Sequence, residues 1–367
     1  MRTSAGWAMV AVGGVLAACH SAPLGEGSTG ESQEAIQGGA VDTADTFAVG
    51  IVDQAASILC SGALIAPNLV LTARHCVSEV PNETVHCASD TFGKLRDAST
   101  LWVTTDVRVM TAQASSYRGR KLFVPSDSAL CGNDIALIEL EVALPDTASL
   151  ATPALEHPLT DAAHYDRSVA AIGYGATSPA GREGGTRRIR EGIAIACIPG
   201  DAKIPCPNSD SLRPSEFATA DGTCQGDSGS SAYEQKGYDS GAALTFGVLS
   251  RGGQDRDADV CVGAIYTRVD SFRDLIVNAA LEAARDGAYP PPSWTKAPRF
   301  DGADAGDLPD GDAELASQDS KGSAAAEEKG CTAAPTGASP PGGMTWLAGL
   351  VAALAIAGRR RSCRRRP

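Results

Sequence analysis

Short apolar runs, separated by turn-forming residues, follow one another along the chain from residue 36 to about residue 287. Runs of this length are typical of antiparallel β-strands. They include residues 64–65, 69–71, 135–138 and 244–248. Near the end of this region the apolar positions recur at helical spacing instead, at Phe272, Leu275, Ile276, Ala279 and Ala280. We therefore expect an all-β domain over residues 36–287 that is closed by one helix.

The composition supports a turn-rich domain and argues against some functions. The 367 residues include 40 glycines and 21 prolines, which favour turns. The formal net charge of -13 argues against nucleic-acid binding, which needs a basic surface. The sequence shows neither a cluster with metal-ligand spacing nor a glycine-rich nucleotide loop. We therefore predict no metal site and no cofactor.

The N-terminal segments differ from this domain. Residues 1–18 contain a basic start and an apolar run too short to span a membrane, as in a signal peptide. The run ends in LAAC, which resembles the lipobox of bacterial lipoproteins and would make Cys19 the lipid-bearing first residue. An ordinary signal peptide with a chance cysteine is the alternative. Residues 19–35 are small and polar, as in a tether or an activation peptide.

The C-terminal segments are distinct as well. Residues 288–330 are rich in proline and then in acidic residues, which predicts a disordered linker. Residues 331–367 begin with Cys331 and contain an apolar run followed by a cluster of arginines. This combination resembles the MYXO-CTERM sorting signal of myxobacterial surface proteins, in which the tail is cut near the cysteine that carries the anchor. A plain membrane anchor with its arginines on the cytoplasmic side is the alternative.

The cysteines indicate the compartment. The chain has 11 cysteines and no CxxC pair, so metal binding does not explain them. An even set lies in the central region, at Cys60, Cys76, Cys87, Cys131, Cys197, Cys206, Cys224 and Cys261. We interpret this set as a disulfide framework formed in an oxidising compartment.

The sequence GDSG at residues 226–229 is a candidate nucleophile turn. A serine hydroxyl such as that of Ser228 needs a base to take its proton and donors to hold an oxyanion. The flanking glycines allow a tight turn, in which the N–H groups of Gly226 and Ser228 could form an oxyanion hole. Taken alone, the motif could equally be a simple turn.

A base and an orienting acid can also be identified. His75 follows an apolar run and precedes Cys76, so a disulfide would fix its position. The other histidines lie in the tether, in polar stretches or in a loop, at His20, His86, His157 and His164. Asp134 lies directly before an apolar run and would be buried, where pairing with an imidazole N–H would stabilise its charge. Read alone, it could be a surface aspartate in a turn.

Together these motifs resemble the chymotrypsin-like serine peptidases. The matching segments are CSGAL at residues 60–64, TARHC at 72–76, NDIAL at 133–137 and CQGDSG at 224–229. They occur in the family's order, which makes His75, Asp134 and Ser228 the expected triad. The resemblance implies two six-stranded antiparallel β-barrels with a C-terminal helix. It also implies a monomeric, exported endopeptidase that hydrolyses proteins or peptides through an acyl-enzyme.

The resemblance implies activation by cleavage and a set of disulfides. The chain would be cut between Ala35 and Ile36, and the new amine of Ile36 would pair with Asp227. Cys60–Cys76 and Cys224–Cys261 match disulfides of the family, whereas Cys87–Cys131 and Cys197–Cys206 are our predictions for the remaining pairs. A flexible linker after the signal peptide is the alternative reading of residues 20–35.

The family's substrate pocket maps onto a short set of positions, namely Gly222, Thr223, Ser250, Gly252 and Ala264. Gly222 stands where trypsin-like enzymes have an aspartate, so we predict a preference for small or medium apolar side chains. Such a pocket could accept Ala35, which suggests self-activation. Three positions depart from the family pattern: Arg74, Ser230-Ser231 and Arg251. Arg251 replaces an aromatic residue and could favour acidic groups on the substrate.

Two other functions compete with this prediction. An inactive homologue could serve as a surface-binding module, although this chain keeps all three triad positions. An esterase with the same triad is disfavoured because the strand–GxSxG–helix motif is absent. Either lipid signal, at Cys19 or Cys331, would hold the protein at a bacterial cell surface or outer membrane. Cleavage at Ile36 would leave only the Cys331 anchor, and release from the cell is the alternative.

Overall fold

The computed structural model describes residues 39–82, 84–109, 111, 114–179, 184–207, 212–221, 223–254 and 261–299, which all lie in one compact unit. The predictions for the signal peptide, the tether and the C-terminal sorting signal fall outside these residues. Among the helices of this part of the chain, none is both long enough and apolar enough to cross a membrane.

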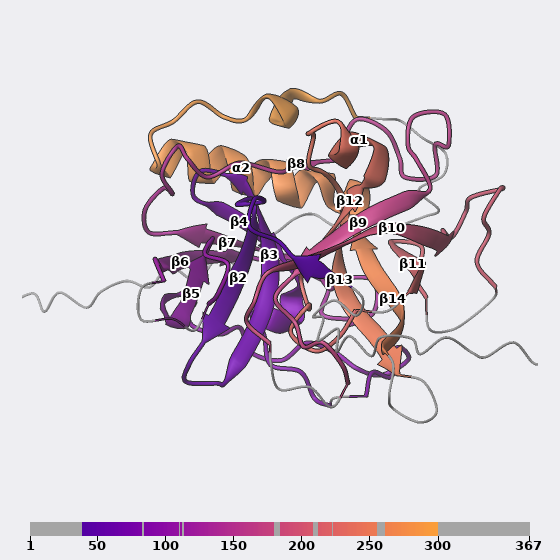
Figure 1. Ribbon diagram of the computed structural model, residues 1–367, viewed down its shortest axis with the longest axis horizontal. Coiled ribbons are helices and arrows are strands. Elements are labelled where there is room, and N and C mark those ends of the chain that lie inside the picture. Colours follow the sequence, from indigo (N-terminus) through magenta and orange to yellow (C-terminus); the bar gives the residue numbers. More distant parts are fainter. Residues whose placement is uncertain are drawn as a thin grey trace, which may run out of the picture. The chain divides into compact units, whose positions relative to one another are not determined.

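The first barrel is formed by six antiparallel strands (Figure 1). They are β2 (Ala48–Asp53), β3 (Ile58–Ala66), β4 (Leu69–Thr72), β5 (Leu101–Thr104), β6 (Tyr117–Phe123) and β7 (Ala136–Leu140). Pairing of β2 with β5 closes the ring in the order β2-β3-β4-β7-β6-β5. Alternate residues of these strands, such as Val49, Ile51, Leu64, Val70 and Ile138, fill its core. The short apolar runs of the sequence therefore form strands because each one buries a face in a closed sheet.

The second barrel has the same number of strands. They are β9 (Ser168–Gly173), β10 (Arg188–Cys197), β11 (Glu216–Asp221), β12 (Ser231–Glu234), β13 (Leu244–Gln254) and β14 (Cys261–Arg268). The strands pair in the order β10-β11-β14-β13-β12-β9, and a further pairing of β10 with β9 closes the ring. Two short strands attach to its outside: β1 (Ala40–Val41) on β10 and β8 (Thr152–Pro153) on β13. A short helix, α1 (Gln235–Asp239), follows β12.

The predicted C-terminal helix is α2 (Arg273–Asp286), which runs along one side of the molecule (Figure 1). Its predicted apolar face is buried, including Leu275, Ile276, Ala279 and Ala280. Ion pairs fix the helix to the first barrel: Lys121 Nζ lies 2.6 Å from Glu282 Oε1, and Arg120 Nη2 lies 2.8 Å from Asp286 Oδ2. The expectation of two six-stranded barrels and a C-terminal helix is thus confirmed.

The packed domain extends beyond its predicted boundary at residue 287. A 3-10 turn at Ser293–Lys296 follows α2, and Trp294 and Ala297 are buried at its end. The proline-rich stretch that suggested a linker therefore begins as a strap that packs on the core, because Trp294 supplies an apolar anchor.

All four predicted disulfides are present, namely Cys60–Cys76, Cys87–Cys131, Cys197–Cys206 and Cys224–Cys261. Two of them fix segments that carry candidate site residues. The first ties the turn after β4 to β3, and the last ties the loop before Ser228 to the start of β14.

Candidate functional site

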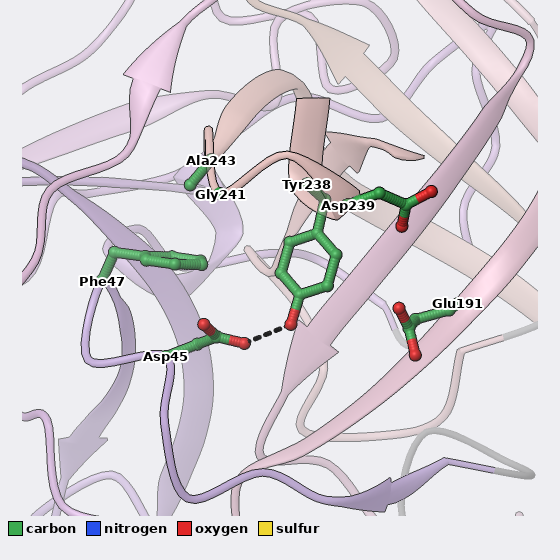
Figure 2. A pocket seen from close by; sticks show the side chains of 7 residues that line it. All are labelled: Asp45, Phe47, Glu191, Tyr238, Asp239, Gly241 and Ala243. Atoms are coloured by element: carbon green, nitrogen blue, oxygen red, sulfur yellow. Dashed lines mark hydrogen bonds between the residues drawn. The ribbon is translucent and has the colours of Figure 1, made fainter. Parts of the chain in front are cut away.

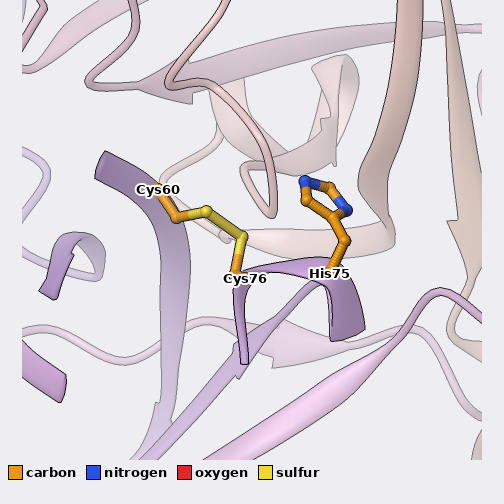
Figure 3. A group of neighbouring side chains, drawn as sticks. All are labelled: Cys60, His75 and Cys76. Atoms are coloured by element: carbon orange, nitrogen blue, oxygen red, sulfur yellow. A yellow bond between two sulfur atoms is a disulfide. The ribbon is translucent and has the colours of Figure 1, made fainter. Parts of the chain in front are cut away.

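His75 and Asp134 form a hydrogen-bonded pair at one end of the first barrel. His75 lies in the 3-10 turn Arg74–Cys76 directly after β4, beside the Cys60–Cys76 disulfide (Figure 3). Asp134 lies just before β7, the strand that pairs with β4. One carboxylate oxygen, Oδ2, lies 2.8 Å from His75 Nδ1, and the other accepts the backbone N–H of His75 at 2.9 Å. The strand pairing therefore brings together two residues that are 59 positions apart in the chain.

The charges of this pair are mutually stabilised. Burial alone would lower the pKa of His75, but the negative charge of Asp134 and their hydrogen bond raise it above its ordinary value. Burial alone would likewise raise the pKa of Asp134, but His75 and the donated hydrogen bonds hold it below its ordinary value. Asp134 therefore stays ionised and fixes the imidazole with its Nδ1 proton towards the carboxylate.

Ser250, from β13 of the second barrel, completes the surroundings of Asp134. Its hydroxyl donates to Asp134 Oδ2 at 2.7 Å. The resemblance predicts Ser250 in the substrate pocket, and the structure shows its hydroxyl in contact with the carboxylate of Asp134. Ser250 thus connects the second barrel to the His75–Asp134 pair.

The GDSG segment forms the expected tight turn. Gly226 and Gly229 have φ angles of 96° and 80°, in the left-handed region that favours glycine. A Cβ on Gly229 would lie 2.2 Å from Thr72 Oγ1, so only glycine allows the turn to approach the segment that leads to His75. The backbone oxygen of Ser228 lies 3.6 Å from Cys76 Sγ, directly beside the histidine turn.

Ser228 is partly exposed, and its side chain is not hydrogen bonded to His75 within the described residues. The backbone N–H groups of Gly226 and Ser228 make no hydrogen bond to any other described residue. They therefore remain available as donors, as an oxyanion hole requires.

Ser61, on β3, was not singled out by the sequence but anchors this turn. Its N–H donates to the oxygen of Ser228 at 2.8 Å, and its hydroxyl donates to the oxygen of Gly226 at 3.0 Å. The same hydroxyl accepts the N–H of Tyr174 at 2.9 Å. A serine in a strand does not usually anchor a distant turn. The only feature of the sequence that could have indicated this role is the position of Ser61 in the CSGAL segment, directly after Cys60.

Asp227 is fully buried in a niche of the second barrel. Its two carboxylate oxygens accept the N–H groups of Gly175 at 2.8 Å and Cys224 at 3.0 Å. A Cβ on Gly173 or Gly175 would lie within 2.6 Å of this carboxylate, so glycines shape the niche. Burial outweighs the two hydrogen bonds and raises the pKa of Asp227 to about 7. Its predicted partner, Ile36, lies outside the described residues.

The predicted pocket residues lie together in part. Gly252 pairs with Ala264 across β13 and β14, and the Gly252 Cα faces Thr223. Thr223 Oγ1 is buried and makes no hydrogen bond to another described residue. Gly222, the predicted pocket floor, lies outside the described residues, as do the lipidation candidates Cys19 and Cys331.

Two of the three departures from the family pattern, Arg74 and Arg251, have structural explanations. Arg74 turns away from the pair: its guanidinium donates to the oxygens of Pro125 and Asp127 and lies 4.6 Å from the ring centre of Phe92. Arg251 forms a bidentate ion pair with the buried Glu216, at 2.7 and 2.9 Å. The suggestion that Arg251 favours acidic substrate groups is therefore not supported, because an internal carboxylate already occupies its guanidinium. Ser230 and Ser231 are buried.

Among the described residues, a group of sulfur atoms lies beside this site, and a cavity lies away from it. The sulfur atoms of Cys60 and Cys76 lie close to His75, but they are bonded to each other and cannot serve as thiolate ligands (Figure 3). A cavity of about 440 Å³ lies elsewhere, between the loop before β2, β10 and α1 (Figure 2). There Tyr238 donates to Asp45 at 2.6 Å, and Glu191 and Asp239 add negative charge.

A family model and several solved structures match this chain. The family model for trypsin matches residues 36–276. Among solved structures, human heparin binding protein is similar, with 20% sequence identity and a TM-score of 0.47; the match covers 67% of this chain and 97% of that chain. A mutant of that human protein matches with 21% identity and a TM-score of 0.45, over the same shares of the two chains.

Proposed function

Because this chain belongs to the trypsin family, we propose that it is a serine endopeptidase with His75, Asp134 and Ser228 as its triad. The hydrogen bond between His75 Nδ1 and Asp134 Oδ2, beside the GDSG turn, is the observation that carries this proposal. It orients the imidazole so that Nε2 is free to act as a base.

In the proposed reaction, His75 Nε2 takes the hydroxyl proton as Ser228 Oγ attacks the substrate carbonyl. The N–H groups of Gly226 and Ser228 hold the oxyanion, and the imidazolium returns its proton to the leaving amine. Water then attacks the acyl-enzyme by the same route, which releases the acid product and restores Ser228. Ionised Asp134 stabilises the imidazolium in both halves of the reaction.

Activation by cleavage between Ala35 and Ile36 is part of the proposal. The carboxylate of Asp227 is buried with two backbone N–H groups as its donors and a raised pKa, so a positive partner would stabilise its charge. The amine of Ile36 would supply that charge once the chain is cut. β1 begins at Ala40 on the second barrel, which supports a short path from Ile36 to this niche.

The four disulfides support an exported protein. We extend this to a surface-anchored monomer that acts on proteins or peptides, held through Cys19 before cleavage and through Cys331 afterwards. Gly222 at the pocket floor leads us to expect cleavage after small or medium apolar residues. Ala35 fits that preference, which is consistent with self-activation.

Labelling with a fluorophosphonate probe tests the proposal. The processed protein should be labelled at Ser228 and should cleave a peptide library, whereas Ser228→Ala should do neither. A matched control, Ser230→Ala, alters the neighbouring buried serine and should keep the labelling. Processed, folded protein without an adduct or turnover would favour the alternative function, a surface-binding module.

For self-activation, Ser228→Ala is expressed in a host that lacks other proteases, and its N-terminus is sequenced. The variant should retain residues 20–35. Cleavage at Ile36 in this variant would show that another protease activates the chain.

A further inference from the structure

A buried ion pair lies directly behind the Asp134 carboxylate. Glu216, on β11, is fully buried, and the side chain of Arg251, on β13, is 13% exposed. Both guanidinium nitrogens Nη1 and Nη2 bind the Glu216 carboxylate, at 2.7 and 2.9 Å. Arg251 Nη1 also donates to Ser250 Oγ at 3.2 Å, and Ser250 donates to Asp134 Oδ2. A continuous chain of hydrogen bonds therefore runs from Glu216 to His75.

The direction of each hydrogen bond in this chain is fixed by chemistry. A guanidinium can only donate, so Ser250 Oγ must accept from Arg251. The serine hydroxyl has a single proton, which is then left for Asp134. Without the guanidinium, the hydroxyl could turn its proton elsewhere, and Asp134 would lose one of its three donors.

Glu216 also holds the loop that carries Asp134. Its carboxylate accepts the N–H of Gly132 at 2.8 Å and the N–H of Arg213 at 2.8 Å, in addition to the guanidinium. Ser215, its neighbour, donates to the oxygen of Gly132 at 2.7 Å. Gly132 lies two residues before Asp134, so the second barrel fixes this first-barrel loop through Glu216.

We propose that Glu216 and Arg251 are positioning residues, which orient the Ser250 hydroxyl and thereby fix the His75–Asp134 pair. The inference rests on the proposed function of that pair. It also gives Arg251 a role at the position where the family has an aromatic residue.

The test follows the titration of the His75 ring by NMR in four forms of the protein. These are the wild type, Ser250→Ala, the double variant Glu216→Gln/Arg251→Met, which keeps an acceptor for the N–H of Gly132, and the triple variant. The double variant removes both charges together, which avoids an unpaired buried charge. Loss of the oriented donor makes Asp134 more basic, so the pKa of His75 should rise by about half a unit.

The triple variant separates positioning from scaffolding. If Glu216 and Arg251 act through Ser250, the double change has no further route to His75 once the Ser250 hydroxyl is gone. The pKa of His75 in the triple variant should then equal its pKa in Ser250→Ala. In the processed enzyme the double variant should lower kcat about 10-fold and leave KM within about twofold. A matched double variant, Lys121→Met/Glu282→Met, removes another partly buried ion pair and should change neither value.

The inference would be overturned if the double change shifted the pKa of His75 equally in the wild type and in Ser250→Ala. It would also be overturned if the double variant titrated like the wild type. If the double variant does not fold, Arg251→Lys keeps a cation for Glu216 but removes the fork, and a smaller shift of the same sign is expected. The titration needs no turnover. The expected pattern in a protein that shows neither turnover nor labelling would therefore refute only the peptidase proposal.

A second cluster of polar side chains lies on the loop between β8 and β9. One donor atom from each of His157, Asp161 and His164 lies within 4.8 Å of the other two. The two imidazole rings stack with their centres 3.6 Å apart, and His164 Nδ1 lies 2.8 Å from Asp161 Oδ2. The nitrogen lone pairs lie in the ring planes, so the exposed His164 would have to rotate out of the stack for both imidazoles to bind one ion.

The backbone of this loop is held in place by the second barrel. Leu159 N donates to the buried Asp270 at 2.7 Å, and Arg167 Nη1 donates to the oxygen of Leu159 at 2.7 Å. Asp161 Oδ1 accepts the N–H of Ala163 at 3.0 Å, which leaves Oδ2 directed at His164. The three donor side chains are therefore presented from a fixed loop.

We infer that His157, Asp161 and His164 form a site for a divalent cation of the zinc type. Two imidazole nitrogens and one carboxylate oxygen suit Zn²⁺, with water as the fourth ligand. This inference is independent of the proposed peptidase function and differs from the expectation of no metal site.

Titration with Zn²⁺, followed by calorimetry and thermal unfolding, tests the site in a His75→Ala background, which removes the triad imidazole. Zinc should raise the unfolding midpoint. Both His164→Ala and Asp161→Asn should reduce the number of bound ions by one. His86→Ala is the matched control, because His86 forms a similar surface pair with Asp90 but has no second imidazole. Unchanged binding in His164→Ala, or no binding in the parent, would refute the site.

Discussion

Two buried carboxylates lie close to the proposed catalytic centre, and their surroundings differ. Asp134 and Asp227 are both completely buried. Asp134 accepts hydrogen bonds from an imidazole, a hydroxyl and a backbone N–H, and its pKa lies below the ordinary value. Asp227 accepts two backbone N–H groups, and its pKa is raised to about 7.

The difference shows that the partners, rather than burial, decide the charge of a buried acid. A titratable cation, His75, outweighs the cost of burying Asp134. Among the described residues, no cationic side chain forms an ion pair with Asp227. The Asp134 niche therefore already holds an ionised acid, whereas a positive group that enters the Asp227 niche would lower the pKa of Asp227 and stabilise its charge. This asymmetry is what an enzyme activated by cleavage requires.

The largest expected effect comes from Asp134→Asn in the processed enzyme. The amide cannot keep the imidazole in the required tautomer, so kcat should fall roughly 10,000-fold with KM little changed. Steady-state kinetics on a peptide substrate measures this. Asp90→Asn, at the surface pair with His86, is the matched control and should leave kcat unchanged. A decrease in kcat of only a few-fold would mean that Asp134 has a structural role and does not orient a catalytic imidazole.

Asp227→Asn should increase the folding stability of the uncleaved precursor at pH 8. The folded pKa of about 7 lies above the ordinary value of 3.8, so the folded wild type binds an extra proton between these values. Its stability should therefore fall as pH rises from about 4 to about 7, by roughly 4 kcal/mol in total. The asparagine variant lacks this titration and should be the more stable form at pH 8.

Urea unfolding of the precursor at both ends of this range, in a Ser228→Ala background that blocks self-cleavage, measures the difference. The processed Asp227→Asn enzyme should lose most of its activity, because the amine of Ile36 has no anionic partner. Parallel pH dependence of the two precursors would contradict the raised pKa. Full activity of the processed variant would contradict the proposed ion pair.

The resemblance carried by the sequence motifs was sufficient to predict the two barrels, and it supplied the candidate site residues. Closed antiparallel barrels produce short apolar runs with many turns, and the four motifs identify the turns that carry His75, Asp134 and Ser228. Two disulfides were implied by the resemblance to the family, and the other two were guesses for the remaining central cysteines that the structure confirms. These features are encoded locally, at the ends of strands.

Contacts that depend on tertiary structure could not be predicted. Glu216 looks like an ordinary polar residue at the start of a strand, and only the pairing of β11, β14 and β13 brings it to Arg251. Trp294 lies in a proline-rich stretch that resembles a linker, because the surface that buries it comes from elsewhere in the chain. The pocket floor at Gly222 and the activation terminus at Ile36 fall outside the described residues, so both stay predictions.

The smallest expected effect comes from Ser61→Ala, which changes the nucleophile turn but leaves the imidazole pair intact. The change removes a donor to the oxygen of Gly226 and an acceptor for the N–H of Tyr174, which should destabilise the fold by about 2 kcal/mol. Because the turn that holds the oxyanion donors loosens, kcat should fall a few-fold.

His75 must be neutral to act as a base, so kcat/KM should decline as pH falls through its raised pKa, above 6.5. Ser61→Ala should keep this acid limb in place, since Ser61 bonds to neither His75 nor Asp134. Ser99→Ala, which removes an exposed serine hydrogen bond, serves as the control. A shift of the acid limb in Ser61→Ala would show that the two niches are coupled rather than separate.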